Sequence, residues 1–192
     1  MRRQACPWFF LLTPQSLILK KTMKICILSD SHDNRTLLAS AVQDAKDRGA
    51  VATLHCGDVV AANTLSVFKK LGMPAHVIYG NNTGDLYTLS RMAHESGNLI
   101  HFYGQDAGIT LHGRTIFIVH YPHYARALAC TGEWDMVCCG HDHRSAIEQV
   151  DNIRGGKTWM VNPGTVGGVG KPPTYVLGDL EAMTFEVLPV PV

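Results

Sequence analysis

The chain has 192 residues, of which 46% are hydrophobic and 17% charged, and its net charge is +1 with histidine neutral. This length suits one domain with a sizeable core, and the composition excludes a disordered chain. The near-neutral balance, without a run of Lys and Arg after the first 22 residues, argues against a long nucleic acid as partner.

The first 22 residues differ from the rest of the chain. Arginines precede two short apolar stretches, as in a signal peptide, but Pro7 and Pro14 interrupt the pattern and no cleavage motif follows. The stretch is also too short and broken for a membrane span. We expect residues 1–22 to be an over-long start or a disordered extension, with an export or anchoring segment as the alternative. Residues 23–192 are then a single domain that needs no membrane.

Six cysteines are present, and none forms a C-x-x-C pair. Three of them lie inside apolar runs: Cys26, Cys56 and Cys138. This usage predicts reduced, mostly buried thiols and a cytoplasmic protein.

In the first half of the domain, strands and helices alternate. Short apolar stretches predict three strands: 24–28, 51–56 and 75–79. Helical patterns follow each strand, at about 34–48, 63–71 and 85–95. Asp33 or Asn34 can cap the first helix, and Gly49 can end it. This rhythm predicts a parallel sheet with helices outside it.

The second half is dominated by strands. A hairpin is expected over 108–119, followed by a short helix over 124–130. Further strands are expected at 136–139, 146–150, 157–161, 174–178 and 184–188. We therefore expect a second, mostly antiparallel sheet that packs face to face with the first, with helices outside both.

Polar residues gather directly after five of the predicted strands. In chain order they are Asp30, His32, Asp58, Asn81, His120, His141 and His143. The carboxyl ends of strands are where open α/β folds build their sites. Residues two apart on an extended segment point the same way, so each pair that is spaced by two can send two side chains to one pocket.

These residue types favour a site with two metal ions. Imidazole, carboxylate and amide ligands without thiolate suit Mn, Fe, Zn, Ni or Co better than Mg or Ca. The two oxygens of Asp58 can bridge two cations. Two divalent ions, offset by Asp30, Asp58 and a bridging hydroxide, leave one positive charge to receive an anionic phosphodiester. Each fragment alone has an ordinary structural explanation, such as a turn at Gly57-Asp58 or a core histidine at His120.

The ordered motif set resembles the calcineurin-like metallophosphoesterases. The matching segments are Ser-Asp-Ser-His (29–32), Gly-Asp (57–58), Gly-Asn-Asn (80–82), Val-His (119–120) and Gly-His-Asp-His (140–143). The small size and Asn-Pro-Gly-Thr (162–165) resemble the compact bacterial and archaeal phosphodiesterase branch, which includes the phosphoesterase-fold subunit of retromer. The resemblance covers about residues 23–190.

This resemblance implies a fold and a ligand set. The fold is an α/β, four-layer α/β/β/α sandwich of two mixed sheets flanked by helices. One metal would be held by Asp30, His32, Asp58 and His143. The second would be held by Asp58, Asn81, His120 and His141. The bridging hydroxide would attack phosphorus in line. The cofactors expected are two divalent transition-metal ions, manganese first, with Ni, Fe, Zn or Co as alternatives.

Three positions depart from the family pattern. Asn82 stands where many relatives have a histidine that helps to protonate the leaving group, and Thr83 replaces a frequent acidic residue. Tyr121 replaces the usual glycine after a ligand histidine and is a bulkier neighbour for the site. Asn82 is therefore a candidate catalytic residue that can donate only a hydrogen bond. His123, three residues after His120, is a second candidate that could reach the leaving oxygen.

The sequence thus predicts a metal-dependent phosphodiesterase with a small phosphodiester substrate. The alternative is a non-catalytic interaction scaffold on the same fold, but the complete set of seven ligands favours the enzyme. A Ser/Thr protein phosphatase matches less well, since those enzymes are longer and grip phosphate with arginines, for which Arg91 is a poor candidate. The sequence is compatible with a homodimer or higher homo-oligomer.

Overall fold

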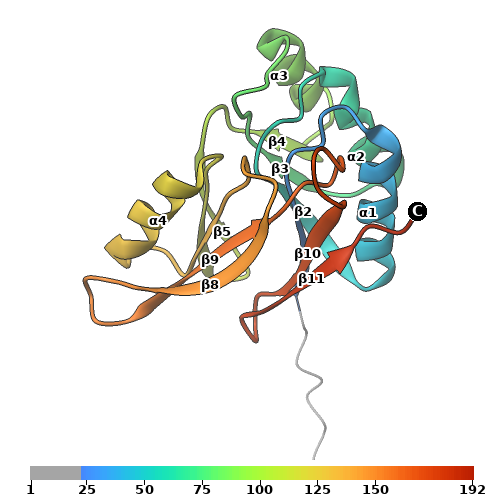
Figure 1. The fold of residues 1–192 in the computed structure, drawn as a ribbon. Coiled ribbons are helices and arrows are strands. Elements are labelled where there is room, and N and C mark those ends of the chain that lie inside the picture. The colour runs from blue at the N-terminus through green and yellow to red at the C-terminus, as the bar shows by residue number, and fades with distance from the viewer. Residues whose placement is uncertain (1–22) are drawn as a thin grey trace, which may run out of the picture.

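Two β-sheets packed face to face form the centre of the fold (Figure 1). The structure is a computed structural model that describes residues 23–192. The predictions for residues 1–22 lie outside the described residues.

The first sheet has six strands. Their order in space is β11 (Thr184–Pro189), β10 (Thr174–Asp179), β1 (Lys24–Leu28), β2 (Ala50–His55), β3 (Ala75–Val77) and β4 (Ile100–Phe102). Strands β1 to β4 run parallel, as the alternation of strands and helices predicts. Strand β4 was not predicted, since three residues are too few to form a visible pattern.

The second sheet has five strands. Their order is β5 (Ala107–Leu111), β6 (Arg114–Ile118), β7 (Met136–Cys138), β9 (Lys157–Pro163) and β8 (Ser145–Asp151). The hairpin of β5 and β6 is confirmed.

The prediction of a mostly antiparallel second sheet was wrong in two respects. Strand β7 pairs in parallel with both of its neighbours. A helix joins β6 to β7, and such a crossover returns the chain in the same direction. Between β7 and β9 the chain passes through β8, which pairs antiparallel with β9. Strands β10 and β11 leave this sheet and extend the first one, where β10 pairs antiparallel with β1. Both sheets are therefore mixed.

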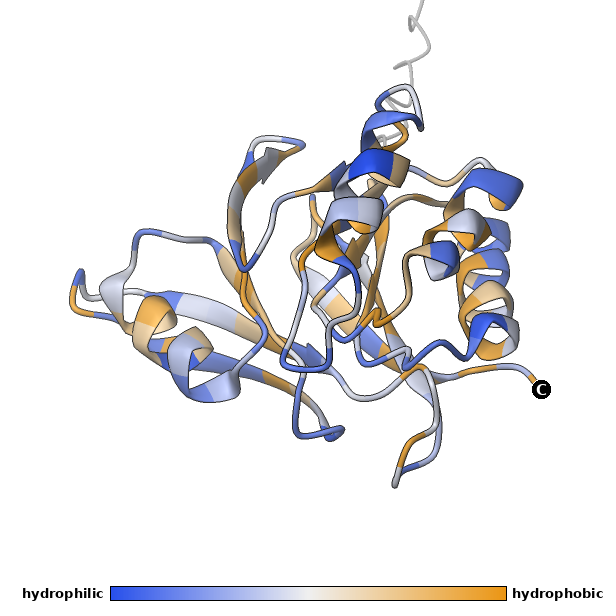
Figure 2. Cartoon of the chain, turned by 90° about the horizontal axis from the view of Figure 1, so that it is seen from above, coloured by the Kyte–Doolittle hydropathy of each residue, from blue (hydrophilic) through white to orange (hydrophobic). Residues whose placement is uncertain are grey.

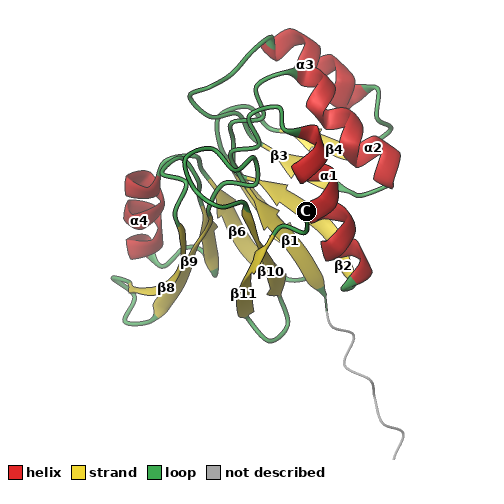
Figure 3. Cartoon of the chain, turned by 45° about the vertical axis from the view of Figure 1, so that its right-hand side comes forward, coloured by secondary structure: helices red, strands yellow, loops and turns green. Residues whose placement is uncertain are grey.

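Helices cover the outer faces of the two sheets (Figure 3). On the first sheet lie α1 (Arg35–Asp47), the 3-10 turn η1 (Ala62–Leu65), α2 (Ser66–Leu71) and α3 (Leu86–His94). On the second sheet lies α4 (Pro122–Thr131). The four-layer α/β/β/α sandwich is thus confirmed. Over residues 23–192, no helix has the length and apolarity needed to cross a membrane.

Three apolar clusters hold these layers together. The first lies between the first sheet and its helices, the second between the sheets, and the third between the second sheet and α4. Helix α1 shows why the sequence folds this way: Leu38, Ala41, Val42 and Ala45 are buried along one stripe, while the Asn34 side chain caps the first turn. Figure 2 shows hydrophobic residues along the strands and polar ones on the outer helix turns.

Candidate metal centre

The loops after β1, β2, β6 and β7 are tied together by backbone hydrogen bonds. The Asp30 N–H donates to the Gly57 carbonyl at 3.0 Å, and the Gly140 N–H donates to the His120 carbonyl at 2.9 Å. The His141 N–H donates to Asp30 Oδ2 at 2.9 Å, which links the two sheets. The carboxyl ends of strands from both sheets therefore meet at one place.

One set of possible ligand atoms comprises Asp30 Oδ1, His32 Nε2 and His143 Nε2. The two imidazole nitrogens lie 3.3 Å apart. The distance to Asp30 Oδ1 is 3.9 Å from His32 Nε2 and 3.4 Å from His143 Nε2. Asp30 is fully buried, and its Oδ1 has no hydrogen-bond donor among the described residues. Burial raises the pKa of Asp30 above its ordinary value. A buried carboxylate oxygen without a donor is costly unless a cation lies beside it, so these atoms fit a metal ion.

A second set lies around His120. Asp58 Oδ1 is 3.4 Å and Asn81 Oδ1 is 3.0 Å from His120 Nε2. Asn81 Oδ1 is also 2.7 Å from His141 Nδ1. Ligand atoms of Asp30, Asp58 and His120 are close enough together to hold an ion.

Asp58 lies between the two sets. Its Oδ2 is 3.6 Å from His32 Nε2, whereas its Oδ1 faces His120 Nε2. Each oxygen of this buried carboxylate thus faces a different group of imidazoles. The structure brings all seven sequence-predicted ligands to one place, while their binding of ions stays a prediction.

Backbone carbonyls set the tautomers of two of these histidines. His120 Nδ1 donates to the Cys56 carbonyl at 2.8 Å, and His143 Nδ1 donates to the Val169 carbonyl at 2.7 Å. A carbonyl can only accept, so the ring proton lies on Nδ1 in both histidines. The unprotonated Nε2 atoms then face the site, as metal ligands require.

The backbone of the site is strained. Five of the seven predicted ligands have a positive φ: Asp30 (54°), His32 (41°), Asp58 (56°), His141 (77°) and His143 (58°). Residues other than glycine rarely adopt this conformation, and it clusters at functional sites. Gly80 shows how tightly the loops approach, because a Cβ there would overlap Asp58 Oδ1 and lie 2.7 Å from His120 Cε1.

The two candidate catalytic residues take different positions. The Asn82 amide donates to Asp58 Oδ2 at 2.7 Å, so it is in direct contact with the site. His123 is exposed on the first turn of α4, and its ring packs against Tyr121 and Tyr124, at 5.6 and 4.2 Å between centroids. Tyr121 in turn packs on His120 and His141, at 5.2 and 4.8 Å. The Tyr121 ring thus contacts both His123 and two of the predicted ligands, and it links His123 to them. Both catalytic roles stay predictions.

Two residues that support the ligand-bearing loops were not singled out from the sequence. Asn162 is buried, and its Nδ2 donates to the Gly140 carbonyl at 3.1 Å and to Asp142 Oδ1 at 2.8 Å. Thr165 Oγ1 donates to the Asp30 carbonyl at 2.9 Å. Both side chains orient loops that carry predicted ligands. Their only sequence signal was the Asn-Pro-Gly-Thr segment.

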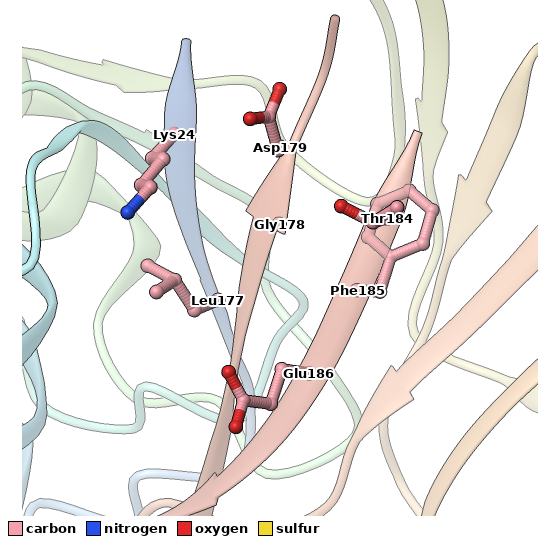
Figure 4. A pocket seen from close by; sticks show the side chains of 7 residues that line it. All are labelled: Lys24, Leu177, Gly178, Asp179, Thr184, Phe185 and Glu186. Atoms are coloured by element: carbon pink, nitrogen blue, oxygen red, sulfur yellow. The ribbon is translucent and has the colours of Figure 1, made fainter. Parts of the chain in front are cut away.

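A hollow on another part of the surface takes no part in the site. It measures about 310 Å³ and lies over β1, β10 and β11 (Figure 4). Lys24 lines it at the amino end of β1, whereas the predicted ligands follow the carboxyl end of that strand.

Comparisons with known proteins identify the family of the chain. Residues 23–183 match the family model of the calcineurin-like phosphoesterase superfamily domain. The chain is 28% identical to phosphodiesterase MJ0936 of Methanocaldococcus jannaschii over 148 residues, which cover 76% of this chain and 86% of that protein.

Solved structures also match the fold. An archaeal phosphodiesterase superposes with a TM-score of 0.78 at 26% identity, over 87% of this chain and 99% of that one. Vps29 of Chaetomium thermophilum shares the fold alone, with a TM-score of 0.57 at 17% identity over 86% and 95% of the two chains. The family match spans most of the chain, so this protein belongs to the calcineurin-like phosphoesterase superfamily, whose enzymes hydrolyse phosphoric ester bonds.

Proposed function

We propose that the chain is a metal-dependent phosphodiesterase that hydrolyses small phosphodiesters at a centre of two divalent transition-metal ions, with manganese as the expected metal. One observation carries the proposal above the others. The two oxygens of Asp58 face separate imidazole groups, at 3.6 Å from His32 Nε2 and 3.4 Å from His120 Nε2. A carboxylate in this position suits two ions about 3.5–4 Å apart.

The residues of the chain have distinct roles in this proposal. Asp30, His32, Asp58 and His143 would hold one ion, and Asp58, Asn81, His120 and His141 the other. Such ions supply a hydroxide nucleophile at neutral pH and neutralise charge on the phosphoryl group. The carbonyls of Cys56 and Val169 keep the unprotonated nitrogens of His120 and His143 directed at the ions. The strained loops hold the ligands in place before the ions bind.

The substrate follows from charge and relatives. With two ions, two carboxylates and one hydroxide the site has a charge of about +1, which complements the single negative charge of a diester. The relatives named phosphodiesterases support the same class. The five described cysteines are free thiols, which supports action in a reducing compartment such as the cytoplasm.

The test begins with metal analysis of the purified full chain. A panel of phosphodiesters and monoesters is then assayed with Mn, Ni, Zn and Mg, before and after treatment with a chelator. We expect about two ions per chain, diester hydrolysis with a transition metal, and loss of turnover on chelation. Turnover that survives complete removal of metal would contradict the proposal. A folded protein that binds metal but hydrolyses nothing in the panel would favour the scaffold alternative.

A further inference from the structure

A small pocket opens directly beside the predicted metal centre. It measures about 190 Å³ and is lined by Tyr79, Gly80, Gln105, Val119, His120 and Tyr121. Pockets for whole drug-sized ligands measure roughly 300–1,000 Å³, so this one suits a single substituent of a substrate. The pocket shares His120 and Gly80 with the predicted centre. A phosphate held at the centre would therefore place one of its ester groups in or against the pocket.

Tyr121 lines this pocket with an aromatic ring that packs against four other rings. Its ring packs edge-on against His120 and His141, with interplanar angles of 70° and 64°. It also contacts Tyr124 and His123 on the first turn of α4. A ring that is half-buried and supported in this way keeps its orientation, so it offers a fixed surface for stacking.

The pocket also carries polar groups that the protein does not use. Over residues 23–192, the hydroxyls of Tyr79 and Tyr121 and the side-chain amide of Gln105 make no hydrogen bond within the chain. Tyr79 contributes a second ring, which packs on Phe102 at 6.4 Å. The amide of Gln105 offers both donors and an acceptor, and each hydroxyl offers a donor and lone pairs.

Aromatic rings beside unused donors and acceptors match a flat heterocycle. Nucleobases are bound by proteins through stacking on aromatic side chains together with hydrogen bonds to their polar edges. A glycerol ester could hydrogen-bond but has no flat ring to stack, and an alkyl ester would leave the polar groups unused. We propose that this pocket binds the nucleobase of a nucleotide diester, with the ring stacked on Tyr121 and its edge hydrogen-bonded to Gln105.

This inference rests on the proposed function, since it takes the phosphate to lie at the metal centre. The test therefore measures binding separately from hydrolysis. Affinities of the Mn-loaded full chain for AMP and for ribose 5-phosphate are measured by calorimetry. The two ligands share the sugar and the phosphate and differ in the base. Hydrolysis of methyl p-nitrophenyl phosphate is measured in parallel as the test of the proposed function.

We expect AMP to bind about 5- to 150-fold more tightly than ribose 5-phosphate, which is the range that stacking of one base supplies. Tyr121→Leu should bring this ratio close to one, while Tyr121→Phe should keep most of it. Gln105→Ala should reduce the ratio without touching a predicted ligand. Tyr103→Leu, at a position outside the pocket, is the matched control and should leave the ratio unchanged.

Mn content is measured for every variant, because Tyr121 contacts two predicted ligands. Equal affinities for AMP and ribose 5-phosphate in the wild type would overturn the pocket assignment, as would a ratio that survives Tyr121→Leu at full Mn content. If AMP is preferred through Tyr121 but no diester is hydrolysed, the pocket stands and the proposed function fails.

Discussion

Asn82 holds the carboxylate of Asp58 through both of its nitrogen atoms. Its side-chain Nδ2 donates to Asp58 Oδ2 at 2.7 Å, and its backbone N–H donates to Asp58 Oδ1 at 2.9 Å. The residue therefore orients the carboxylate that is proposed to bridge the ions. An amide cannot give up a proton at neutral pH, so Asn82 does not supply acid catalysis.

We expect aryl phosphodiesters to be cleaved faster than aryl monoesters, and alkyl monoesters to be nearly inert. A monoester carries a second charge, which a site of charge near +1 does not match, and a poor leaving group lacks a proton donor. Asn82→His should raise monoesterase relative to diesterase activity, since general acid catalysis contributes roughly 10²–10⁴-fold where it operates. The measurement is kcat/KM for matched esters with Mn.

Asn82→Ala is the control for this experiment. It removes the side-chain bond to Asp58 without adding an imidazole, so it should not raise the monoesterase share. A wild-type enzyme that prefers the monoester would contradict the argument and would direct attention to His123 as the acid.

Loss of Asp58 should affect both ions. Asp58→Ala is expected to reduce metal content from about two ions per chain to near zero and to abolish hydrolysis, because each carboxylate oxygen faces one imidazole group. His143→Ala should weaken mainly one ion. Metal analysis after dialysis measures the number of ions per chain in both variants. Full metal content and turnover in Asp58→Ala would show that the two-metal assignment is wrong.

Gly80→Ala should damage the centre without removing any proposed ligand. The added Cβ would overlap Asp58 Oδ1 and push against His120, so we expect metal affinity to fall by about 10–100-fold. Gly156→Ala is the matched control, because its Cβ would meet only Asn152, at an ordinary contact distance of 3.7 Å. Titration with Mn measures both variants, and equal affinities would refute the crowding argument.

His76 should contribute to acid sensitivity away from the metal centre. Burial, together with nearby His101, lowers the pKa of His76 to about 4. Between about pH 6.5 and pH 4 the unfolded chain binds a proton that the folded His76 does not, so stability is lost as the pH falls through this window.

His76→Gln can keep a hydrogen bond to the Tyr103 hydroxyl, which lies 2.7 Å from His76 Nδ1, but cannot titrate. The free energy of unfolding, measured with chelator present at pH 7 and pH 4.5, should fall less in His76→Gln than in the wild type. An equal fall in the two proteins would contradict this prediction.

We also expect a chain that starts at Met23 to be folded and fully active. The residues before Met23 contribute none of the strand and helix pattern from which the fold was predicted. Melting temperature and diester turnover of the full and shortened chains provide the comparison. A large drop in either would show that the first 22 residues support the domain.

Local patterns in the sequence were enough to predict most elements and the residues that meet at the candidate site. The apolar stripe of α1, its cap at Asn34 and the short apolar strands all depend on residues close in the chain. The site residues follow from equally local patterns, because each turn at a strand end exposes its own polar side chains. These turns are Gly-Asp, Gly-Asn-Asn and Gly-His-Asp-His. The η1 turn before α2 was read as helix, since both patterns look alike over so few residues.

Pairing between distant segments was decided only in the tertiary structure. Strand order depends on which edges and apolar faces become available, so the return of β10 to β1 could not be read from either segment alone. The bond from Asn82 to Asp58 and the pocket formed by Tyr79, Gln105 and Tyr121 likewise join separate loops. The residue types that carry the chemistry are thus set by the sequence, whereas the distances between them arise when two sheets pack their strand ends together.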